Sequence, residues 1–390
     1  MRFDRYFRYL TLLWLVGVSL RLTLLSIPPL IPNIHDELHM NATEVGFLNG
    51  LPSLLLAFAA VPGSLLIARL GVRNALVVGL LLTAIGGALR GLIPDIAWLF
   101  LLTIVTSAGV AVLQVTMPPA VRAWVPNRIA FATALYTNGL LVGEVLPTLL
   151  TLSMVVPLVG GSWQWALVIW SIPVCLIALM VQTLAPADPP TANSSSRRAW
   201  WPDWRNKLVW RLGLMLGSIN ALYFATNAFI PDYLREHGQG EWISLVLSSF
   251  NAGQLPASAL LLFFARRLQL KVWPLVACGC LCILATLAIV FGSGPWVVAA
   301  AVIDGFAAAP TLILILALPP LISPPQDLHR VTAAMFTISY SCAVIVPIVS
   351  GMFWDWSGKA ALAFLPIVAC GVLLTVLAPS IRHVPKQRVE

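Results

Sequence analysis

Long apolar stretches alternate with short polar connections along almost the whole chain. Each stretch has about 20 residues, and a helix of that length crosses a hydrocarbon core about 30 Å thick. The pattern therefore predicts an all-α membrane protein with twelve transmembrane helices. We expect these helices over residues 10–31, 44–68, 74–93, 97–120, 129–156, 162–184, 208–231, 242–265, 272–292, 296–320, 330–354 and 360–379.

Composition and charge agree with a membrane protein. Only 10% of the residues are charged, whereas soluble proteins carry about 25%. The net charge of +8 can indicate nucleic-acid binding in a soluble protein. With the N-terminus inside, however, all but four of the 23 Lys and Arg residues fall on the cytoplasmic side, the exceptions being Arg21 in the membrane and Arg90, Arg235 and Lys359 outside. The positive-inside rule thus explains the charge. We expect a bacterial inner-membrane protein with both termini cytoplasmic, the lipid bilayer as its surroundings and no nucleic-acid partner.

One long polar segment divides the chain into halves that repeat each other. Residues 185–207 are rich in Pro, Ser, Asn and Arg, which predicts a cytoplasmic linker between six-helix bundles over 1–184 and 208–390. The halves match at an offset of about 200 residues. The matches are 68–73 with 266–271, Phe47-x-x-Gly50 with Phe250-x-x-Gly253, Ile31-Pro32 with Ile230-Pro231, and Pro118-Pro119 with Pro319-Pro320. Two pseudo-symmetric halves are typical of alternating-access secondary transporters.

The sequence shows no motif of an enzyme or a metal site. Cys278, Cys280 and Cys282 alternate along one predicted helix, so their thiols point to different faces. We therefore interpret them as small buried residues. The sequence contains no nucleotide-binding loop and no nucleophile motif. We expect no enzymatic activity, no metal and no cofactor.

Arg21 interrupts the first apolar stretch near the middle of the predicted bilayer core. A charge there costs at least about 2.5–3.5 kcal/mol, so the side chain must face a protein interior or a wet cavity. One interpretation is a cationic anchor for a solute anion, because the guanidinium can hold a carboxylate or oxyanion through two hydrogen bonds. The other is a structural ion pair with Glu144 of the same bundle. The two are compatible, since a solute anion can compete with Glu144 for Arg21.

Glu144 and Asp304 are the two acidic residues placed deep in predicted spans. A buried carboxyl group beside an arginine can load and release a proton. Both residues are therefore candidates for proton coupling. The alternative is that one of them lies nearer the outer mouth than the predicted spans suggest.

The repeat adds further candidates for solute binding. An offset of 199 residues, taken from the Ile-Pro pairs, places Asn220 at the position equivalent to Arg21. Tyr223 and Asn227 follow Asn220 at helical spacing on the same face. These side chains can bind a solute or pack against another helix through their amides. Gln114, Gln254 and Tyr340 are weaker candidates, because a single polar residue in an apolar span is explained almost as well by an interhelical hydrogen bond.

The loop after the second predicted helix resembles a motif of the major facilitator superfamily. Ser64-x-Leu66-x-Ala68-Arg69-x-Gly71-x-Arg73 is similar to the pattern G-x-L-x-D-R-x-G-R-[RK]. The resemblance implies the fold of that superfamily and a gating role for Arg69, Arg73 and their counterpart Arg267. Ser64 and Ala68 depart from the pattern, so this chain lacks the Asp to which the latch of the superfamily is attributed.

The N-terminal half resembles, more narrowly, the cyanate permease and nitroimidazole transporter branch. The similar pieces are Ser19-Leu20-Arg21, Pro28-Pro29-Leu30, Leu51-Pro52, Leu89-Arg90, Ala132-Thr133-Ala134-Leu135-Tyr136 and Ser162-Trp163-Gln164-Trp165-Ala166-Leu167. The resemblance implies passage of a small anion or small polar organic solute across the inner membrane.

These observations favour a secondary active transporter that takes up such a solute with protons and works as a monomer. An exporter of small aromatic or nitro compounds by proton antiport is the alternative. Drug exporters of the superfamily usually carry G-x-x-x-G-P-x-x-G-G in the fifth helix, and residues 139–147 lack its Gly-Pro and Gly-Gly pairs. A membrane sensor that does not transport is a remote alternative.

Overall fold

The computed structural model describes residues 2–40, 42–187 and 200–383, and these ranges contain helices but no strand. The longer helices are α1 (Arg2–Leu22), α3 (Ala42–Leu89), α4 (Ile96–Trp124), α5 (Ile129–Leu150), α7 (Trp163–Leu184), α8 (Lys207–Glu236), α9 (Ile243–Leu268), α10 (Trp273–Phe291), α11 (Pro295–Leu316), α13 (Leu328–Ser357) and α14 (Leu365–Leu377). The short helices are α2 (Ile31–Leu38), α6 (Val156–Leu158) and α12 (Leu318–Ile322). The all-helical prediction is confirmed.

Ten helices among the described residues are long and apolar enough to cross a membrane, so the chain is a multi-pass membrane protein. The span Gly50–Leu89 has 40 residues, which corresponds to roughly 60 Å of helix, or two bilayer crossings. It is broken at Gly71, whose φ of 82° and ψ of 177° require glycine. The break separates the predicted spans 44–68 and 74–93. Because α1 is not among the ten spans, the count of twelve stays a prediction.

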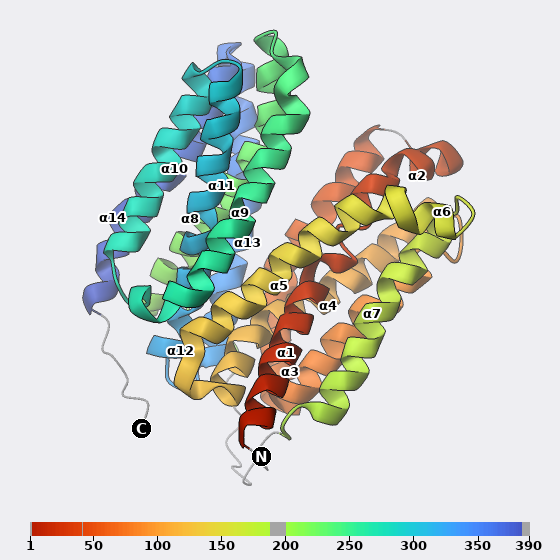
Figure 1. Ribbon diagram of the computed structural model, residues 1–390, viewed down its shortest axis with the longest axis vertical. Helices are drawn as coiled ribbons and strands as arrows, with labels where there is room; N and C mark the ends of the chain where they lie inside the picture. Colours follow the sequence, from red (N-terminus) through yellow and green to blue (C-terminus); the bar gives the residue numbers. More distant parts are fainter. Residues whose placement is uncertain (1, 41, 188–199, 384–390) are drawn as a thin grey trace. The chain divides into compact units, whose positions relative to one another are not determined.

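The chain forms two compact units. Unit 1 consists of Met1–Pro202 with Pro325–Ala333, and unit 2 consists of Asp203–Pro324 with Ala334–Glu390. In Figure 1 the helices α1 to α7 run from red to yellow-green and α8 to α14 from green to blue. Residues 188–199 of the predicted linker over 185–207 lie outside the described residues, and the division at that linker stays a prediction.

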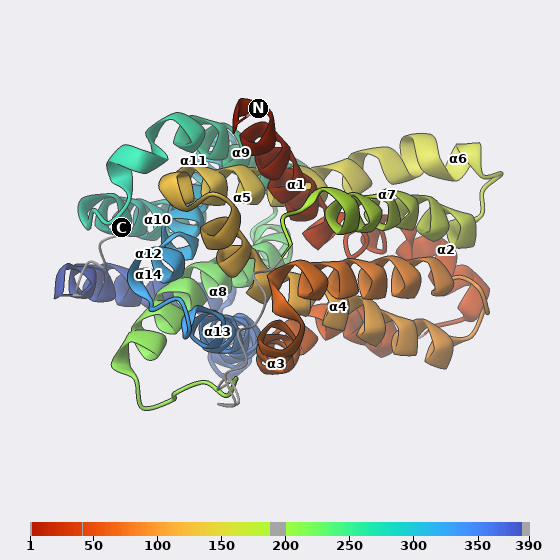
Figure 2. The ribbon, with the colours of Figure 1, turned by 90° about the horizontal axis from the view of Figure 1, so that it is seen from below.

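In unit 1, α3 packs lengthwise against α4 and also contacts α7, while α1 packs against α5 (Figure 2). The α1–α5 contact brings the two backbones together through glycines. A Cβ atom added to Gly139 would lie less than 3.0 Å from the carbonyl oxygen of Trp14, and one added to Gly143 less than 3.0 Å from that of Val18. The four-residue spacing of these two glycines is a small-xxx-small pattern, which allows close helix approach. Side chains of α1 and α5 that flank the contact are therefore close enough to interact.

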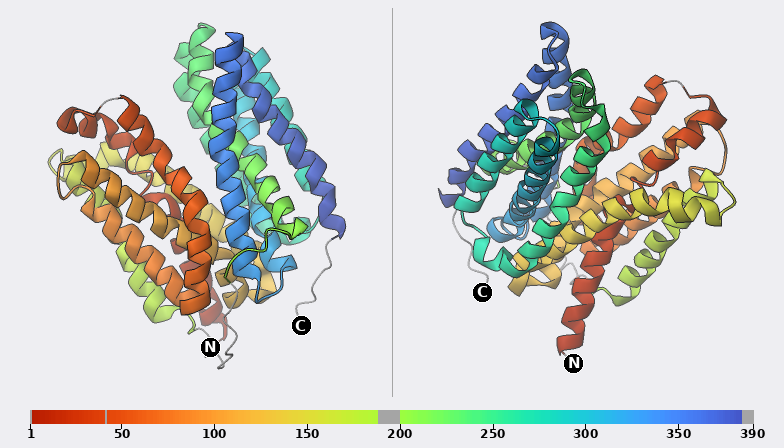
Figure 3. Two further views of the ribbon diagram at one scale, coloured as in Figure 1. Left: turned by 180° about the vertical axis from the view of Figure 1, so that it is seen from behind. Right: turned by 45° about the horizontal axis from the view of Figure 1, so that its top comes forward.

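In unit 2, α11 packs against α9 and α10, and α14 packs against α8 and α10 (Figure 3). Here too, glycines allow close contacts between helices. Added Cβ atoms at Gly213 and Gly217 would meet Ile338 and Cys342 at less than 3.0 Å, which brings α8 directly against α13. Both units thus use a pair of glycines four residues apart on one helix to seat a polar residue against its partner helix.

Candidate functional site

Arg21 and Glu144 meet where α1 and α5 pack together. The Nε atom of Arg21 lies 3.3 Å from the Oε1 atom of Glu144, and both side chains are 15% exposed. Arg21 stands in the last turn of α1, and Glu144 directly follows Gly143, which packs on the α1 backbone. The tight backbone contact therefore fixes where the carboxylate can lie. The alternative of an ion pair between these two residues agrees with this geometry.

A second polar contact links the same two helices. The indole nitrogen of Trp14 donates to the Oδ1 atom of Asn138 at 3.1 Å. Trp14 and Arg21 are seven residues apart and so share a face of α1. Asn138 is a polar residue of α5 that the sequence analysis did not single out. Its place within an apolar span was the available signal.

In unit 2, Tyr223 and Asn227 of α8 form a network with Asn251 of α9. The hydroxyl of Tyr223 donates to Asn251 Oδ1 at 2.6 Å, and Asn251 Nδ2 donates to Asn227 Oδ1 at 3.1 Å. Asn227 Nδ2 in turn donates to the carbonyl of Tyr223 at 3.0 Å. The predicted face of α8 is thus a real cluster, and its central residue, Asn251, was missed. Spacing along α8 carries no information about which residue of α9 lies opposite.

Asn220, the counterpart of Arg21 in the repeat, lies against α13. Its Nδ2 atom donates to the hydroxyl of Ser339 at 2.8 Å. Tyr340 follows Ser339, is buried, and stacks on Phe336 with ring centroids 6.2 Å apart. The contact forms because Gly217, one turn before Asn220, allows α13 to approach α8. Asn220 therefore takes part in the contact between α8 and α13, and Tyr340 is the next residue along α13 after its partner Ser339.

The two isolated glutamines are buried, Gln114 in α4 and Gln254 in α9. Within the described part of the chain, Gln114 Oε1 and Gln254 Nε2 have no hydrogen-bond partner. An unsatisfied buried polar group costs about 1–3 kcal/mol. These two atoms therefore form no hydrogen bond between the described helices.

Asp304 is fully buried in α11 and faces α10. Its Oδ2 atom accepts a hydrogen bond from the hydroxyl of Thr286 at 3.3 Å, and the thiol of Cys282 lies 4.0 Å from its carbonyl oxygen. Its Oδ1 atom has no hydrogen-bond partner among the described residues, and no described cation forms an ion pair with it. These contacts of Asp304 thus join α11 to α10.

The three basic residues with an implied gating role occupy different surroundings. Arg69 and Arg267 are exposed, whereas Arg73 donates to the carbonyl of Gln182 in α7. Because Gly71 breaks α3 between Arg69 and Arg73, the break turns the chain back so that Arg73 reaches the end of α7.

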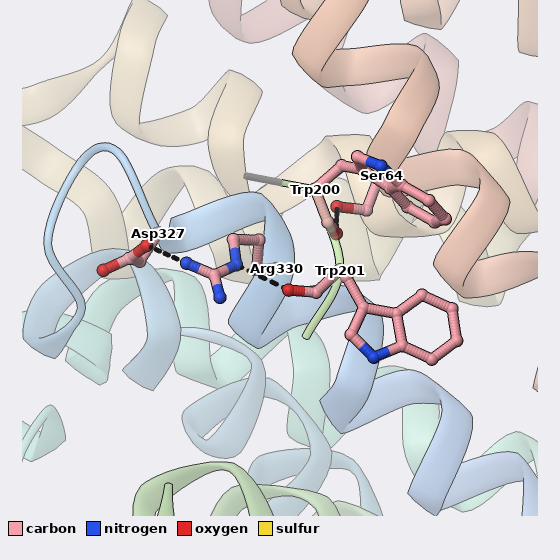
Figure 4. Close-up of polar contacts among 5 residues, drawn as sticks. All are labelled: Ser64, Trp200, Trp201, Asp327 and Arg330. Carbon is pink, nitrogen blue, oxygen red and sulfur yellow. Dashed lines mark hydrogen bonds and ion pairs between the residues drawn. The ribbon is translucent and has the colours of Figure 1, made fainter. Parts of the chain in front are cut away.

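Ser64, which replaces the Gly of the superfamily motif, is fully buried and holds the chain near Trp200 (Figure 4). Its hydroxyl donates to the carbonyl of Trp200 at 2.9 Å, and Arg330 Nε donates to the carbonyl of Trp201 at 2.8 Å. Arg330 also pairs with Asp327 at 2.7 Å. All five residues belong to unit 1. We refer to the contacts of Ser64 and Arg330 with Trp200 and Trp201 as the linker clasp.

An all-helical chain with many apolar spans and buried charged residues in their interior defines a polytopic membrane protein of the transporter type. A family model described as Major Facilitator Superfamily matches residues 13–347. The chain belongs to this superfamily, as its sequence motif indicates.

Three similar proteins come from bacteria. The cyanate transport protein CynX of Escherichia coli (strain K12) is 25% identical over 384 residues, covering 94% of this chain and 96% of that protein. The 2-nitroimidazole transporter of the same strain is 29% identical, covering 58% of this chain and 57% of that protein. The uncharacterized transporter YycB of Bacillus subtilis (strain 168) is 28% identical, and the match spans 57% of this chain and 55% of that protein.

Solved structures of the superfamily share the fold. The transporter FucP in its outward conformation has a TM-score of 0.75 at 15% identity, with 97% of this chain and 99% of that chain covered. The proton:xylose symporter XylE bound to 6-bromo-6-deoxy-D-glucose has a TM-score of 0.76 at 13% identity, with 99% and 97% covered. At such identities the likeness shows the fold alone. The resemblance to the superfamily and to its cyanate and nitroimidazole branch is confirmed.

Proposed function

We propose that the protein is a secondary active transporter that moves a small anion or small polar organic solute across the bacterial inner membrane by alternating access. Both termini are cytoplasmic in this proposal, and the protein works as a monomer that takes up its solute with protons. The observation that carries the proposal is the ion pair between Arg21 and Glu144 inside unit 1. An arginine in an apolar span is costly, and such residues usually mark a solute or proton path.

Arg21 is the proposed anchor for the solute. Its guanidinium has five N–H donors in a planar fork, and the ion pair with Glu144 is formed by the Nε atom. Both side chains retain 15% exposure, so a small anion can reach the pair. An anion that binds the same guanidinium competes with Glu144. Solute binding would then release a carboxylate that must take up a proton or find another donor, and this links the solute to the proton.

The other proposed solute contacts are polar groups described above within each unit. Gln114 lies in unit 1, and Asn220, Tyr223, Asn227, Gln254 and Tyr340 lie in unit 2. The unpaired atoms of the two glutamines support this role. Asn251 joins the set because it is bonded to both Tyr223 and Asn227.

Glu144 and Asp304 are the proposed proton-coupling residues. Leaving a charged carboxylate buried without a cation costs several kcal/mol. Asp304 has no ion-pair partner among the described residues, which supports the neutral, proton-carrying form. Glu144 has Arg21 beside it and so can hold its negative charge until a solute displaces it. The two carboxyl groups would thus carry protons at different stages.

We propose that Arg69, Arg73 and Arg267 act in gating, and that the linker clasp takes part in place of the Asp missing at Ala68. Ser64→Ala removes the donor to the carbonyl of Trp200. We expect slower transport at unchanged solute affinity, since the clasp touches no proposed solute contact. Ser107→Ala, at another buried hydroxyl of unit 1, is the control. Wild-type transport by the Ser64 variant would exclude the clasp from gating.

The similarity to a 2-nitroimidazole transporter favours one second candidate, a proton-antiport exporter of small aromatic or nitro compounds. Uptake of radiolabelled cyanate and 2-nitroimidazole into proteoliposomes, with imposed pH gradients of either sign, tests both. Symport predicts cyanate accumulation when the outside is acidic. Antiport predicts nitroimidazole accumulation when the inside is acidic. Transport that does not depend on the pH gradient of either sign would contradict proton coupling.

A further inference from the structure

A second arginine, Arg90, lies buried at the place where α1 ends. Its position in the sequence places it among the charges of the outer side, but the residue is only 1% exposed. Its Nη2 atom donates to the carbonyl of Thr23 at 2.6 Å. No described carboxylate pairs with it, and its Nε and Nη1 atoms have no partner in the described part of the chain. The contact with Thr23 is therefore what holds this buried charge.

The end of α1 needs such a contact. Pro28 and Pro29 lack N–H donors, and the ring of each crowds the carbonyl four residues earlier, which disfavours a regular helix through Leu24 and Leu25. The helix stops at Leu22, inside the first predicted span. The last carbonyls of a helix have no intrahelical donor and carry a partial negative charge. The Thr23 carbonyl, just past the last helical residue, accepts hydrogen bonds from the Ser26 hydroxyl at 2.9 Å and from the Arg90 guanidinium, and the guanidinium also neutralises part of that charge.

Close packing at the end of α3 brings Arg90 to this position. A Cβ atom added to Gly87 would lie less than 3.0 Å from the hydroxyl of Ser171 and 3.3 Å from Cγ2 of Thr23. One added to Gly91 would lie 2.6 Å from Cα of Gln164. The glycines on both sides of Arg90 thus let α3 end against α1 and α7.

Arg21 stands directly before the capped end. Its carbonyl accepts the hydrogen bond of Leu25 N at 2.9 Å, in the turn that closes α1, while its side chain pairs with Glu144. Thr23 is two residues further along. A shift of the Thr23 carbonyl therefore shifts the Arg21 backbone and the direction of its guanidinium.

We propose that Arg90 is a positioning residue for Arg21: by capping the broken end of α1 it fixes the Arg21 guanidinium against Glu144 and the incoming anion. The inference rests on the proposed function, in which Arg21 is the solute anchor. Arg90 itself does not contact the solute.

Two measurements test the inference. The first is hydrogen exchange of the backbone around residues 21–27 in the purified protein without ligand. Arg90→Met should speed exchange there, and Arg90→Lys should restore slow exchange because it returns a cationic donor. Ser107→Ala is the matched control for loss of a buried polar group in unit 1. Exchange in Arg90→Met as slow as in wild type would overturn the cap.

The second measurement is the affinity for cyanate, formate and nitrate in the single and double variants. Arg90→Met should weaken binding by about 10- to 100-fold, the loss typical of a displaced binding group. In an Arg21→Lys background, which still binds the anion weakly, the loss should be smaller, because Arg90 acts through the planar guanidinium of Arg21. Wild-type affinity in Arg90→Met, or an equal loss of affinity in both backgrounds, would overturn the positioning role of Arg90 but not the anchor role of Arg21. Unchanged affinity in Arg21→Ala would overturn the solute anchor as well. If Arg90→Met fails to fold, Arg90→Gln takes its place in both measurements.

Discussion

The guanidinium of Arg21 and the carboxylate of Glu144 lie 3.3 Å apart because the helices that carry them touch backbone to backbone. Gly143 precedes Glu144 and packs on the carbonyl of Val18, three residues before Arg21. The pair is thus set by the shape of the α1–α5 contact rather than by attraction alone. In the proposed function, a solute anion opens this pair by replacing the carboxylate.

The contact between Gly143 and Val18 gives the first prediction. Gly143→Ala should push α1 and α5 apart, destabilise the protein by about 1–3 kcal/mol, and weaken the binding of cyanate or formate. Thermal unfolding and anion titration of the purified variant measure both effects. Gly50→Ala is the control, because an added Cβ there meets nothing within 4 Å. Equal behaviour of the two variants would mean that the close contact does not set the site.

Replacement of Glu144 by Gln removes the proposed competitor for Arg21. Anion affinity should rise by about tenfold or more, the equivalent of one hydrogen bond to a charged group. In the wild type, protonation of Glu144 frees Arg21, so binding should strengthen as the pH falls. In Glu144→Gln binding should not depend on pH in this way. Anion titrations across a pH series, with Thr148→Ala one turn further along α5 as the control, measure this. A full pH response in Glu144→Gln would reject the role of Glu144.

Asp304→Asn keeps the shape of a protonated carboxyl group and its contact with Thr286. If Asp304 is neutral in the resting protein, the free energy of unfolding should change by less than about 1 kcal/mol. The variant should still exchange solute across proteoliposomes but should not accumulate it with a pH gradient. Asp232→Asn, at an exposed carboxylate, is the control. Accumulation at the wild-type level would show that Asp304 carries no coupled proton.

The sequence predicts the helices well because hydropathy depends on residues that are close in the chain. It also places Arg21 and Glu144 in one bundle and offers their ion pair as one of two interpretations. Contacts between helices are a different matter. Asn251 binds Tyr223 from α9, and Ser64 binds the carbonyl of Trp200, which is 136 residues away. Residue spacing along a single helix does not predict contacts of this kind.

The burial of Arg90 is a second feature that the sequence does not predict. Its place near the outer end of the predicted span 74–93 suggests an exposed charge of the outer side, and the positive-inside rule treats it so. It is buried because Gly87 and Gly91 let the end of α3 pack on Thr23 and Gln164. Glycine in an apolar span is common, and its packing partner is known only once the helices are assembled. The only feature of the sequence that singled out Arg90 is the similarity of Leu89-Arg90 to the cyanate permease and nitroimidazole transporter branch.

In the proposed mechanism, Arg21 holds the transported anion. This role is tested most directly by the thermal stabilisation of the purified protein by cyanate, formate and nitrate in wild type, Arg21→Ala, Arg21→Lys and the double variant Arg21→Ala with Glu144→Gln. The double variant avoids leaving a buried carboxylate without its cation. We predict stabilisation in the wild type, weaker stabilisation in Arg21→Lys, which lacks the planar fork, and none in the two Arg21→Ala proteins. Wild-type stabilisation of folded Arg21→Ala would contradict this role of Arg21.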